Sequence, residues 1–229
     1  METANILIVE DDVDINRLLC TILEGAGYTC RAAFSGSEAL LWAEKYDYDL
    51  IVLDLMLPGV TGEELIAKIR RGKTMPIIVA SAKVGVSDRV NVLKLGADDF
   101  IPKPFDNAEV LARVEAQLRR SREFSTQKGD VLTVGSLTLD RDSHTAAVDG
   151  AELPLTGREF DILALLMANP RRAFSRAQIY EAVWGEDFLG DENTVNVHVS
   201  NLRAKLAKAD PERAYIKTVW GIGFKLAEA

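Results

Sequence analysis

Acidic side chains follow two short apolar runs in the first half of this chain. Glu10 and Asp11 come directly after the run Asn5–Val9, and Asp54 comes directly after Leu50–Leu53. Clustered carboxylate oxygens suit Mg²⁺, and without a cation they would repel one another. With a metal to reduce electrostatic repulsion, the central carboxylate of Asp54 can act as a nucleophile toward phosphorus.

A hydroxyl group and an ammonium group follow two further runs. Ser81 comes after Pro76–Ala80, and Lys103 comes after Asp99–Pro102. Both groups can hold phosphoryl oxygens. A single Asp at a strand end is usually a helix cap or a turn residue, and we interpret Asp14 as the N-cap of the helix that follows it. Four strand ends that all carry phosphoryl-transfer chemistry are harder to explain by capping.

The elements that must position these residues alternate between β-type runs and amphipathic helices. A fifth run is Tyr28–Ala33, and Leu50–Leu53 is apolar without alternation, as in a strand buried on both faces. A helical stripe is formed by Ile15, Leu18, Leu19, Ile22 and Leu23. This pattern predicts an α/β fold, a doubly wound five-stranded parallel sheet, which binds ligands beyond the carboxyl ends of its strands.

The second half of the chain has a different pattern. We expect a first domain over residues 1–121, a polar linker over 122–130 and a second domain over 131–229. Short strands are predicted at Leu132–Leu139 and Thr145–Leu155. Helices are predicted at Thr156–Met167, Ser175–Trp184 and Asn193–Leu206, and a hairpin at Ile216–Val219 and Phe224–Leu226. This order predicts an α+β winged-helix domain.

Composition excludes several classes of protein. The 229 residues, 48% hydrophobic and 27% charged, favour two folded domains over a disordered or collagen-like chain. No apolar run approaches the ~20 residues that span a bilayer, and the N-terminus lacks the basic region of a signal peptide. Cys20 and Cys30 are too few for a disulfide framework or a zinc site, so we expect a cytoplasmic protein with no membrane partner. The net charge of -8 argues against nonspecific coating of nucleic acid.

The motifs of both halves resemble known families. Residues 9–12, 54–59, 81–82 and 96–105 look like a response-regulator receiver domain. Residues 193–203 and 218–224 are similar to the winged helix of the OmpR/PhoB family. Together the two resemblances cover nearly the whole chain, in the order that this family has.

The resemblance implies a phosphoacceptor and a metal site. Asp54 would accept the phosphoryl group. Asp11, Asp54 and the backbone carbonyl of Met56 would hold Mg²⁺, with Glu10 acting directly or through water. A haloacid-dehalogenase-type hydrolase also uses an Asp nucleophile, but it needs a second Asp two residues later as the acid/base, and Met56 occupies that position. We therefore expect a regulator and not an enzyme, with phosphorylation and dephosphorylation at Asp54 only.

Further roles follow from the same resemblance. Ser81 and Lys103 would bind the phosphoryl group, and the peptide bond between Lys103 and Pro104 is expected to be cis. Phe100 would be the switch aromatic, which swings inward when Ser81 moves toward the phosphate. A sensor histidine kinase would be the phosphodonor.

The same resemblance implies a charged face that pairs two phosphorylated receivers. Its residues are Arg89, Asp98, Asp99, Glu109 and Arg113. Arg89 with Glu109, and Asp98 or Asp99 with Arg113, are the pairs that we predict, although the sequence does not say which are intermolecular. The alternative is a solvated surface whose exposed ion pairs contribute little.

The third predicted helix of the second domain is interpreted as the recognition helix. Residues 130–229 contain 11 Lys and Arg against 15 Asp and Glu, a net charge of -4, so positive charge must gather on one face. A 100° wheel places Val195, Val199, Leu202 and Leu206 toward the core and leaves Val197 on the opposite arc. The predicted DNA contacts are Val197, His198, Ser200, Asn201, Arg203, Lys205, Lys217, Trp220 and Lys225.

Two places in the second domain depart from the family, one on the third helix and one on the hairpin. Arginines are common where this chain has Ser200 and Asn201, so base preference cannot be copied. Trp220 replaces a common wing arginine that enters the minor groove; it is either an exposed residue that wedges or stacks on DNA, or a packing residue of the core or hairpin. Trp184 either flanks a loop, 185–192, that contacts RNA polymerase or closes the core.

The sequence thus predicts a cytoplasmic transcription factor of a two-component system. A histidine kinase would phosphorylate Asp54, a homodimer would form, and paired winged helices would bind double-stranded promoter DNA, with RNA polymerase as a further partner. The second hypothesis is a receiver whose C-terminal domain binds RNA or another protein.

Overall fold

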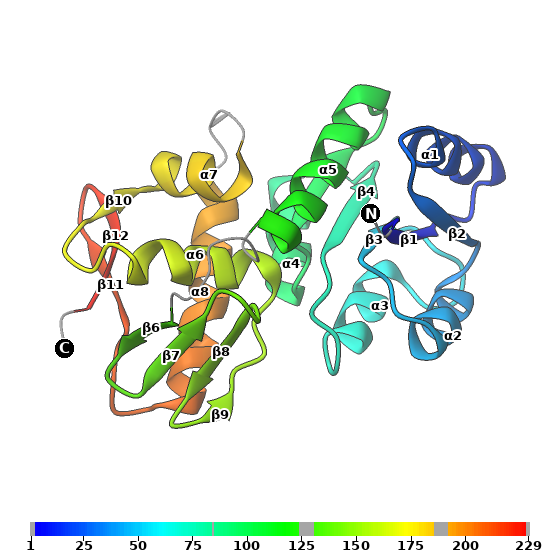
Figure 1. Ribbon diagram of the computed structural model, residues 1–229. Coiled ribbons are helices and arrows are strands. Elements are labelled where there is room, and N and C mark those ends of the chain that lie inside the picture. Colours follow the sequence, from blue (N-terminus) through cyan, green and yellow to red (C-terminus); the bar gives the residue numbers. More distant parts are fainter. Residues whose placement is uncertain (1–2, 84, 124–130, 186–191, 228–229) are drawn as a thin grey trace. The chain divides into compact units, whose positions relative to one another are not determined.

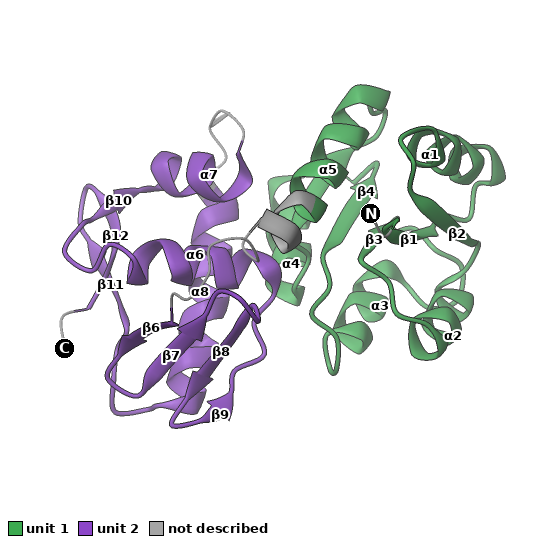
Figure 2. Cartoon of the chain, in the orientation of Figure 1, with its two compact units in different colours: residues 1–118 green, residues 119–229 purple. Residues whose placement is uncertain are grey.

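The computed structural model describes residues 3–83, 85–123, 131–185 and 192–227. The chain divides into two compact units, Met1–Leu118 and Arg119–Ala229, which Figure 2 colours separately. Of the segment 122–130 that the sequence predicts as a linker, residues 124–130 lie outside the described residues. Each unit has its own hydrophobic core, as expected for structures that fold around separate sets of buried side chains.

The first unit is built on a parallel sheet with the strand order β2-β1-β3-β4-β5 (Figure 1). The strands are β1 (Asn5–Val9), β2 (Thr29–Ala33), β3 (Leu50–Leu53), β4 (Ile77–Ser81) and β5 (Asp99–Pro102). Every residue of β3 is buried, which explains its apolar run without alternation. The predicted doubly wound parallel sheet is confirmed.

Helices cover both faces of this sheet. They are α1 (Val13–Gly25), α2 (Gly36–Lys45), α3 (Gly62–Ile69), α4 (Val86–Leu95) and α5 (Asn107–Glu123). Ile6 and Ile8 of β1 share a core cluster with Leu19 of α1 and Val110 of α5. Leu7, between them, points to the opposite face and is also buried, because successive strand residues alternate in direction.

The start of α1 corrects one expectation. Asp12, not Asp14, is the N-cap: its Oδ1 accepts hydrogen bonds from the backbone N–H groups of Asp14 and Ile15, at 2.9 and 3.0 Å. Asp14 lies in the first turn, where an acidic side chain interacts favourably with the helix dipole. Because both residues are acidic and adjacent to the helix start, sequence pattern alone did not separate the two positions.

The second unit begins with an antiparallel sheet of strand order β6-β7-β8-β9. The strands are β6 (Val131–Val134), β7 (Leu137–Asp140), β8 (Thr145–Val148) and β9 (Ala151–Glu152). The single strand predicted over Leu132–Leu139 is in fact two strands, because Gly135 adopts a positive φ of 62° and turns the chain. Asp149 and Gly150 make the turn between β8 and β9, as predicted.

Helices and a terminal hairpin complete the second unit. The elements are α6 (Gly157–Met167), β10 (Phe174–Ser175), α7 (Arg176–Trp184), α8 (Glu192–Ala209), β11 (Ile216–Val219) and β12 (Gly223–Leu226). The Glu159 side chain accepts a hydrogen bond from Thr156 N at 2.8 Å at the start of α6. Strands β10, β12 and β11 form an antiparallel sheet, so the predicted α+β winged helix is confirmed.

Candidate functional site

An acidic pocket lies at the carboxyl edge of the parallel sheet, between β1 and β3, where the strand order reverses. Glu10 and Asp11 follow β1 and Asp54 follows β3, and one carboxylate oxygen of each lies within 4.8 Å of the others. Backbone hydrogen bonds from Asp54 N to Val9 O (2.9 Å) and from Glu10 N to Ala33 O (3.0 Å) hold the strand ends in place. The fold thus gathers three carboxylates that are far apart in the sequence.

Lys103 enters this pocket from the end of β5. Its Nζ donates hydrogen bonds to Asp54 Oδ2 at 2.5 Å and to Glu10 Oε2 at 2.6 Å. Its backbone N–H donates to Ser81 O at 3.0 Å, which places the ends of β4 and β5 side by side. The peptide bond between Lys103 and Pro104 is cis, as the resemblance implies.

Burial and charge shift the pKa values of two groups in the pocket. Burial raises the pKa of Glu10, and the hydrogen bond and charge of Lys103 oppose this shift without cancelling it. Burial tends to lower the pKa of Lys103, but the hydrogen bonds to Asp54 and Glu10 outweigh it and leave the pKa above its ordinary value. One ammonium group faces three carboxylates, so the pocket favours an additional cation.

The donor set of the pocket fits Mg²⁺. Carboxylate and carbonyl oxygens are the hard ligands that this ion prefers, and Asp11 remains exposed to solvent from which an ion would enter. Met56 N donates a hydrogen bond to Asp54 Oδ1 at 3.1 Å, so the Met56 peptide lies beside the predicted phosphoacceptor. Receiver domains bind Mg²⁺ at an acidic pocket of this kind.

Ser81 and Phe100 are both buried in this unit. Ser81 ends β4, and its hydroxyl accepts a hydrogen bond from Lys83 N at 3.4 Å. Phe100 lies in β5, opposite Val79 of β4, with its ring on the inward side. Their roles in holding a phosphoryl group and in switching stay predictions.

Two residues that support the pocket were not among the site residues predicted from the sequence. Asn16 of α1 is 1% exposed, and its Nδ2 donates to Glu10 O at 3.0 Å and to Ala33 O at 3.2 Å. Gly62, at the start of α3, packs so closely that a Cβ there would lie 2.6 Å from Asp54 O. Asn16 stands three and seven residues before core positions of α1, a helical spacing that marks it as inward-facing and was overlooked.

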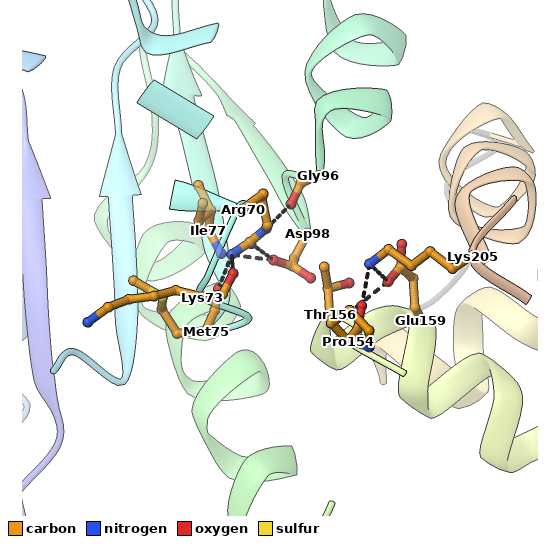
Figure 3. A network of polar contacts seen from close by, with 10 residues as sticks. All are labelled: Arg70, Lys73, Met75, Ile77, Gly96, Asp98, Pro154, Thr156, Glu159 and Lys205. Carbon is orange, nitrogen blue, oxygen red and sulfur yellow. Dashed lines mark hydrogen bonds and ion pairs between the residues drawn. The ribbon is translucent and has the colours of Figure 1, made fainter. Parts of the chain in front are cut away.

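Asp98 does not belong to a surface, which corrects its assignment to a dimer face. Its side chain is fully buried, and its Oδ2 accepts hydrogen bonds from Arg70 Nη2 at 2.7 Å and from Ile77 N at 2.9 Å. Arg70 also donates to the carbonyls of Gly96 and Met75, both at 2.8 Å (Figure 3). The pair therefore ties the start of β5 to the segment after α3.

Three further charges of the predicted dimer face, Asp99, Glu109 and Arg113, form contacts within the unit. Arg113 Nη1 lies 3.2 Å from Asp99 Oδ1, and Arg113 Nη2 lies 3.0 Å from Glu109 Oε1. Asp99 with Arg113 is one of the predicted pairs, here within one chain. Within the chain Glu109 pairs with Arg113, and the predicted pair of Glu109 with Arg89 stays a prediction. Whether these charges also act across two protomers stays a prediction.

Two predicted DNA contacts on α8 are corrected by burial. Val197 is 5% exposed and His198 is 1% exposed, and the His198 ring lies 5.4 Å from the ring of Trp184. The helical wheel assumed one buried arc, but α8 packs against both α6 and α7 and buries a wider arc. The exposed stripe of α8 consists of Asn193, Ser200, Ala204, Ala207, Lys208 and Ala209.

Arg203 and Lys205 are engaged within the second unit. Arg203 Nη2 donates to Ile216 O at 3.0 Å and to Thr218 Oγ1 at 2.9 Å, which joins α8 to the hairpin. Lys205 Nζ donates to Glu159 Oε2 at 2.6 Å and to the carbonyl of Pro154 at 2.8 Å (Figure 3). Lys205 therefore stabilises the start of α6, and a phosphate would have to compete with that carboxylate.

The hairpin of β11 and β12 carries a basic outer face and an aromatic tip. Lys217 and Lys225 are cross-strand partners, so they share one face, whereas the neighbouring Phe224 is buried on the other. Trp220 is 91% exposed at the turn. The interpretation of Trp220 as an exposed hairpin residue is confirmed, and the alternative that it packs in a core is wrong.

Trp184 closes the core of the second unit. Its side chain is buried and stacks on Tyr180, with ring centroids 4.9 Å apart and an interplanar angle of 2°. This agrees with the second of the two alternatives for Trp184. Most of the loop 185–192 that was predicted to contact RNA polymerase, residues 186–191, lies outside the described residues.

Sequence comparison relates both units to known proteins. Residues 6–115 match the model of the response regulator receiver domain, and residues 150–226 match that of the C-terminal domain of transcriptional regulatory proteins. The transcriptional regulatory protein ResD of Bacillus subtilis is 42% identical over 96% of this chain and 94% of its own length. SrrA of Staphylococcus aureus is 40% identical over the same shares of the two chains.

Solved structures agree with this relationship. A mutant of RitR is similar with a TM-score of 0.81 at 28% identity, and the match covers 99% of this chain and 100% of that one. DrrB of Thermotoga maritima, an OmpR/PhoB homologue, has a TM-score of 0.53 at 26% identity over the same shares. Within the described residues, no helix is long and apolar enough to cross a membrane.

Proposed function

The chain belongs to the two-component response regulators of the OmpR/PhoB type, and from this premise we propose that phosphorylation of Asp54 controls its binding to promoter DNA. The protein is a transcriptional regulator with a receiver domain followed by a winged-helix DNA-binding domain. Membership of the response regulator family supports a non-catalytic regulator. The observation that supports the proposal is the cluster of three carboxylates and Lys103 at the switch point of the sheet.

In the proposed reaction, a carboxylate oxygen of Asp54 attacks the phosphorus of a phosphohistidine on a sensor kinase. The new P–O bond replaces the P–N bond, and the histidine leaves. Lys103 already contacts Asp54, so its ammonium group can move onto a phosphoryl oxygen with little displacement. Ser81 is proposed to bind a second phosphoryl oxygen.

We propose that Glu10, Asp11, Asp54 and the carbonyl of Met56 hold Mg²⁺. The ion would supply positive charge that reduces repulsion between the carboxylates and an incoming phosphoryl group. Asn16 keeps the backbone of Glu10 in place through its hydrogen bond to the carbonyl, so it is a positioning residue for this site.

The proposed DNA surface combines α8 with the hairpin. The exposed stripe of α8 offers small and amide side chains for base edges, with Ser200 within it and the half-buried Asn201 beside it. Lys217 and Lys225 can contact phosphates, and Trp220 can reach a groove from the hairpin tip. RNA polymerase is proposed as a further partner of the DNA-bound protein.

A binding assay with and without phosphorylation tests the proposal. We expect the full chain with Mg²⁺ and a small phosphodonor, such as acetyl phosphate, to retard double-stranded promoter DNA in a gel at lower protein concentration than the untreated chain. Binding to single-stranded RNA of the same sequence should not respond to the phosphodonor. Equal binding to the RNA, or no effect of the phosphodonor on DNA binding, would favour the second hypothesis of an RNA or protein partner.

We further propose that phosphorylated receivers pair through the face that contains Arg89. The Arg89→Glu substitution should leave phosphorylation intact and weaken dimerisation about tenfold. Negative charges of the two protomers would then face each other at two places that the two-fold axis relates. Arg113 is a poorer site for this test, since its reversal also breaks two ion pairs within the chain. Sedimentation of the phosphorylated protein measures the effect.

Arg71→Glu provides a matched control for this prediction. Arg71 is exposed at the end of α3, and the substitution changes the net charge by the same amount. Dimerisation of this control should equal that of the wild type. A dimer content unchanged in Arg89→Glu as well would place the interface elsewhere.

A further inference from the structure

The two cysteines of the chain meet inside the first unit. Cys20 lies on α1 and Cys30 on β2, and the interaction between their thiols shifts the pKa of both groups. Both side chains are half-buried and pack against the edge of the same hydrophobic cluster. The sequence indicates only that two cysteines are too few for a disulfide framework or a zinc site, and the proposed phosphorylation uses neither of them.

The turn between α1 and β2 explains why these thiols are adjacent. Hydrogen bonds from Gly27 N to Glu24 O at 2.9 Å and from Tyr28 N to Leu23 O at 3.1 Å fix a tight reversal of the chain. Cys20 and Cys30 both stand roughly 7 Å from that reversal, given a rise of about 1.5 Å per helical residue and about 3.3 Å per strand residue. They therefore lie at the same level.

The direction of the strand side chains brings Cys30 toward α1. The next residue, Arg31, places its guanidinium 4.5 Å from the ring centroid of Trp42 on α2, so it points to the other face of the sheet. Because successive strand residues alternate, Cys30 points to the face that α1 covers. The pairing of the two thiols is thus built into the sheet and does not depend on a mobile side chain.

The two thiols differ in reactivity. The hydrogen bond from Cys30 lowers the pKa of the Cys20 thiol, against the opposing effects of burial and Glu24. The same hydrogen bond, followed by burial, raises the pKa of Cys30. Cys20 therefore has the greater thiolate character, which makes it the better nucleophile toward an oxidant, and Cys30 is placed to attack its product.

We propose that Cys20 and Cys30 form a reversible intramolecular disulfide on exposure to hydrogen peroxide. The Cys20 thiolate attacks one peroxide oxygen, the O–O bond breaks, and the released hydroxide takes up a proton to become water. The sulfur of Cys30 then attacks the sulfenic acid of Cys20, the S–S bond forms, the S–O bond breaks, and a second water leaves with the thiol proton. Two thiols and one peroxide thus yield one disulfide and two waters, and a dithiol reductant reverses the change.

The disulfide is also expected to affect the acidic pocket through Asn16, and this expected effect on phosphorylation rests on the proposed function. The Cys20 thiol lies 3.6 Å from Asn16 Oδ1, and Asn16 supports the carbonyls of Glu10 and Ala33. Oxidation removes the S–H donor from Asn16 and draws Cys20 toward β2. We therefore infer that the oxidised protein takes up phosphate at Asp54 more slowly than the reduced protein.

Tryptic mapping tests the disulfide without reference to phosphorylation. Cleavage after Arg17 and Arg31 releases one peptide, residues 18–31, that contains both cysteines. After treatment of the full chain with stoichiometric peroxide and then an alkylating reagent, we expect this peptide to lack both alkyl groups and to weigh two hydrogens less than the dithiol. Recovery of the doubly alkylated peptide, or of disulfides between chains only, would overturn the proposal.

Single substitutions test the order of the two steps. In Cys30→Ser, a cyclic 1,3-diketone should trap sulfenic acid at Cys20, whereas in Cys20→Ser the remaining Cys30 should stay unlabelled. Equal labelling of both variants would overturn the assigned roles. Mg²⁺-dependent labelling of the oxidised and the reduced wild type by a phosphodonor then tests the link to the pocket. Equal rates of labelling would overturn that link. Absence of labelling in both forms would contradict the proposed function, but it would not affect the evidence for the disulfide from peptide mapping.

Discussion

The Asp54→Asn variant is expected to take up no phosphoryl group from acetyl phosphate in the presence of Mg²⁺, whereas the wild type is labelled. An amide is not a competent nucleophile at phosphorus, so the loss should be complete at the sensitivity of the assay. The substitution is nearly isosteric, and Lys103 keeps its hydrogen bond to Glu10 at 2.6 Å. The variant should therefore remain folded, with a melting temperature close to that of the wild type.

Asp47→Asn is a matched control for this prediction. This variant makes the same Asp-to-Asn substitution on an exposed side chain outside the pocket. The ion pair of Asp47 with Lys73 is exposed, so its loss should change stability little. This control should be labelled like the wild type. Labelling of Asp54→Asn at wild-type stoichiometry would place the phosphoacceptor elsewhere, and Asp11 would be the next residue to test because it is the exposed carboxylate of the pocket.

The parallel sheet was predictable because its residues obey a local rule. Strands buried on both faces need continuous apolar runs, and β1, β3 and β5 begin and end where those runs do. The carboxyl ends of parallel strands meet at one edge, so the convergence of Glu10, Asp54 and Lys103 followed from the parallel direction of the strands. The misplaced cap at Asp14 is an error of two residues at an element boundary, where local signals compete, whereas the unseen turn at Gly135 joined two strands into one.

Features that depend on packing between distant elements were not predictable in this way. Asp98 looked like a surface charge because nothing in its neighbourhood reveals that Arg70, twenty-eight residues earlier, enters the core beside it. Val197 and His198 looked exposed because a helical wheel describes one helix, whereas α8 is covered by two others. Lys205 looked like a phosphate contact until its carboxylate partner Glu159 was located on α6. Each of these errors concerns a side chain whose partner or covering element is remote in sequence.

Trp220 stands at the exposed tip of the hairpin, where the resemblance implies an arginine. We expect Trp220→Ala to weaken binding to the promoter site about tenfold, since stacking or wedging of an aromatic ring on bases contributes ~1–3 kcal/mol. Its side chain is 91% exposed, so its removal should leave the melting temperature unchanged. The slope of log K against log[salt] should also stay the same, because an indole ring neutralises no phosphate.

Trp220→Arg separates the shape of this contact from its charge. An arginine at the hairpin tip would add a cation beside Lys217 and Lys225, so the slope of log K against log[salt] should steepen by roughly 1 for each restored contact. Binding should then exceed that of Trp220→Ala at low salt and lose this advantage as salt rises. Val131→Ala, which shortens an exposed apolar side chain on another strand of the same unit, should change neither quantity.

Measurement of binding at several salt concentrations, with melting curves for all four proteins, distinguishes the possible roles of the tip. If Trp220→Ala binds like the wild type and Trp220→Arg leaves the slope unchanged, the hairpin does not enter a groove, and α8 alone must provide the base contacts. If the alanine variant loses affinity while its slope stays constant, the tip acts through its ring. In that case the hairpin supplies an uncharged contact, and a domain with a net charge of -4 depends less on phosphate neutralisation than an arginine-bearing wing would.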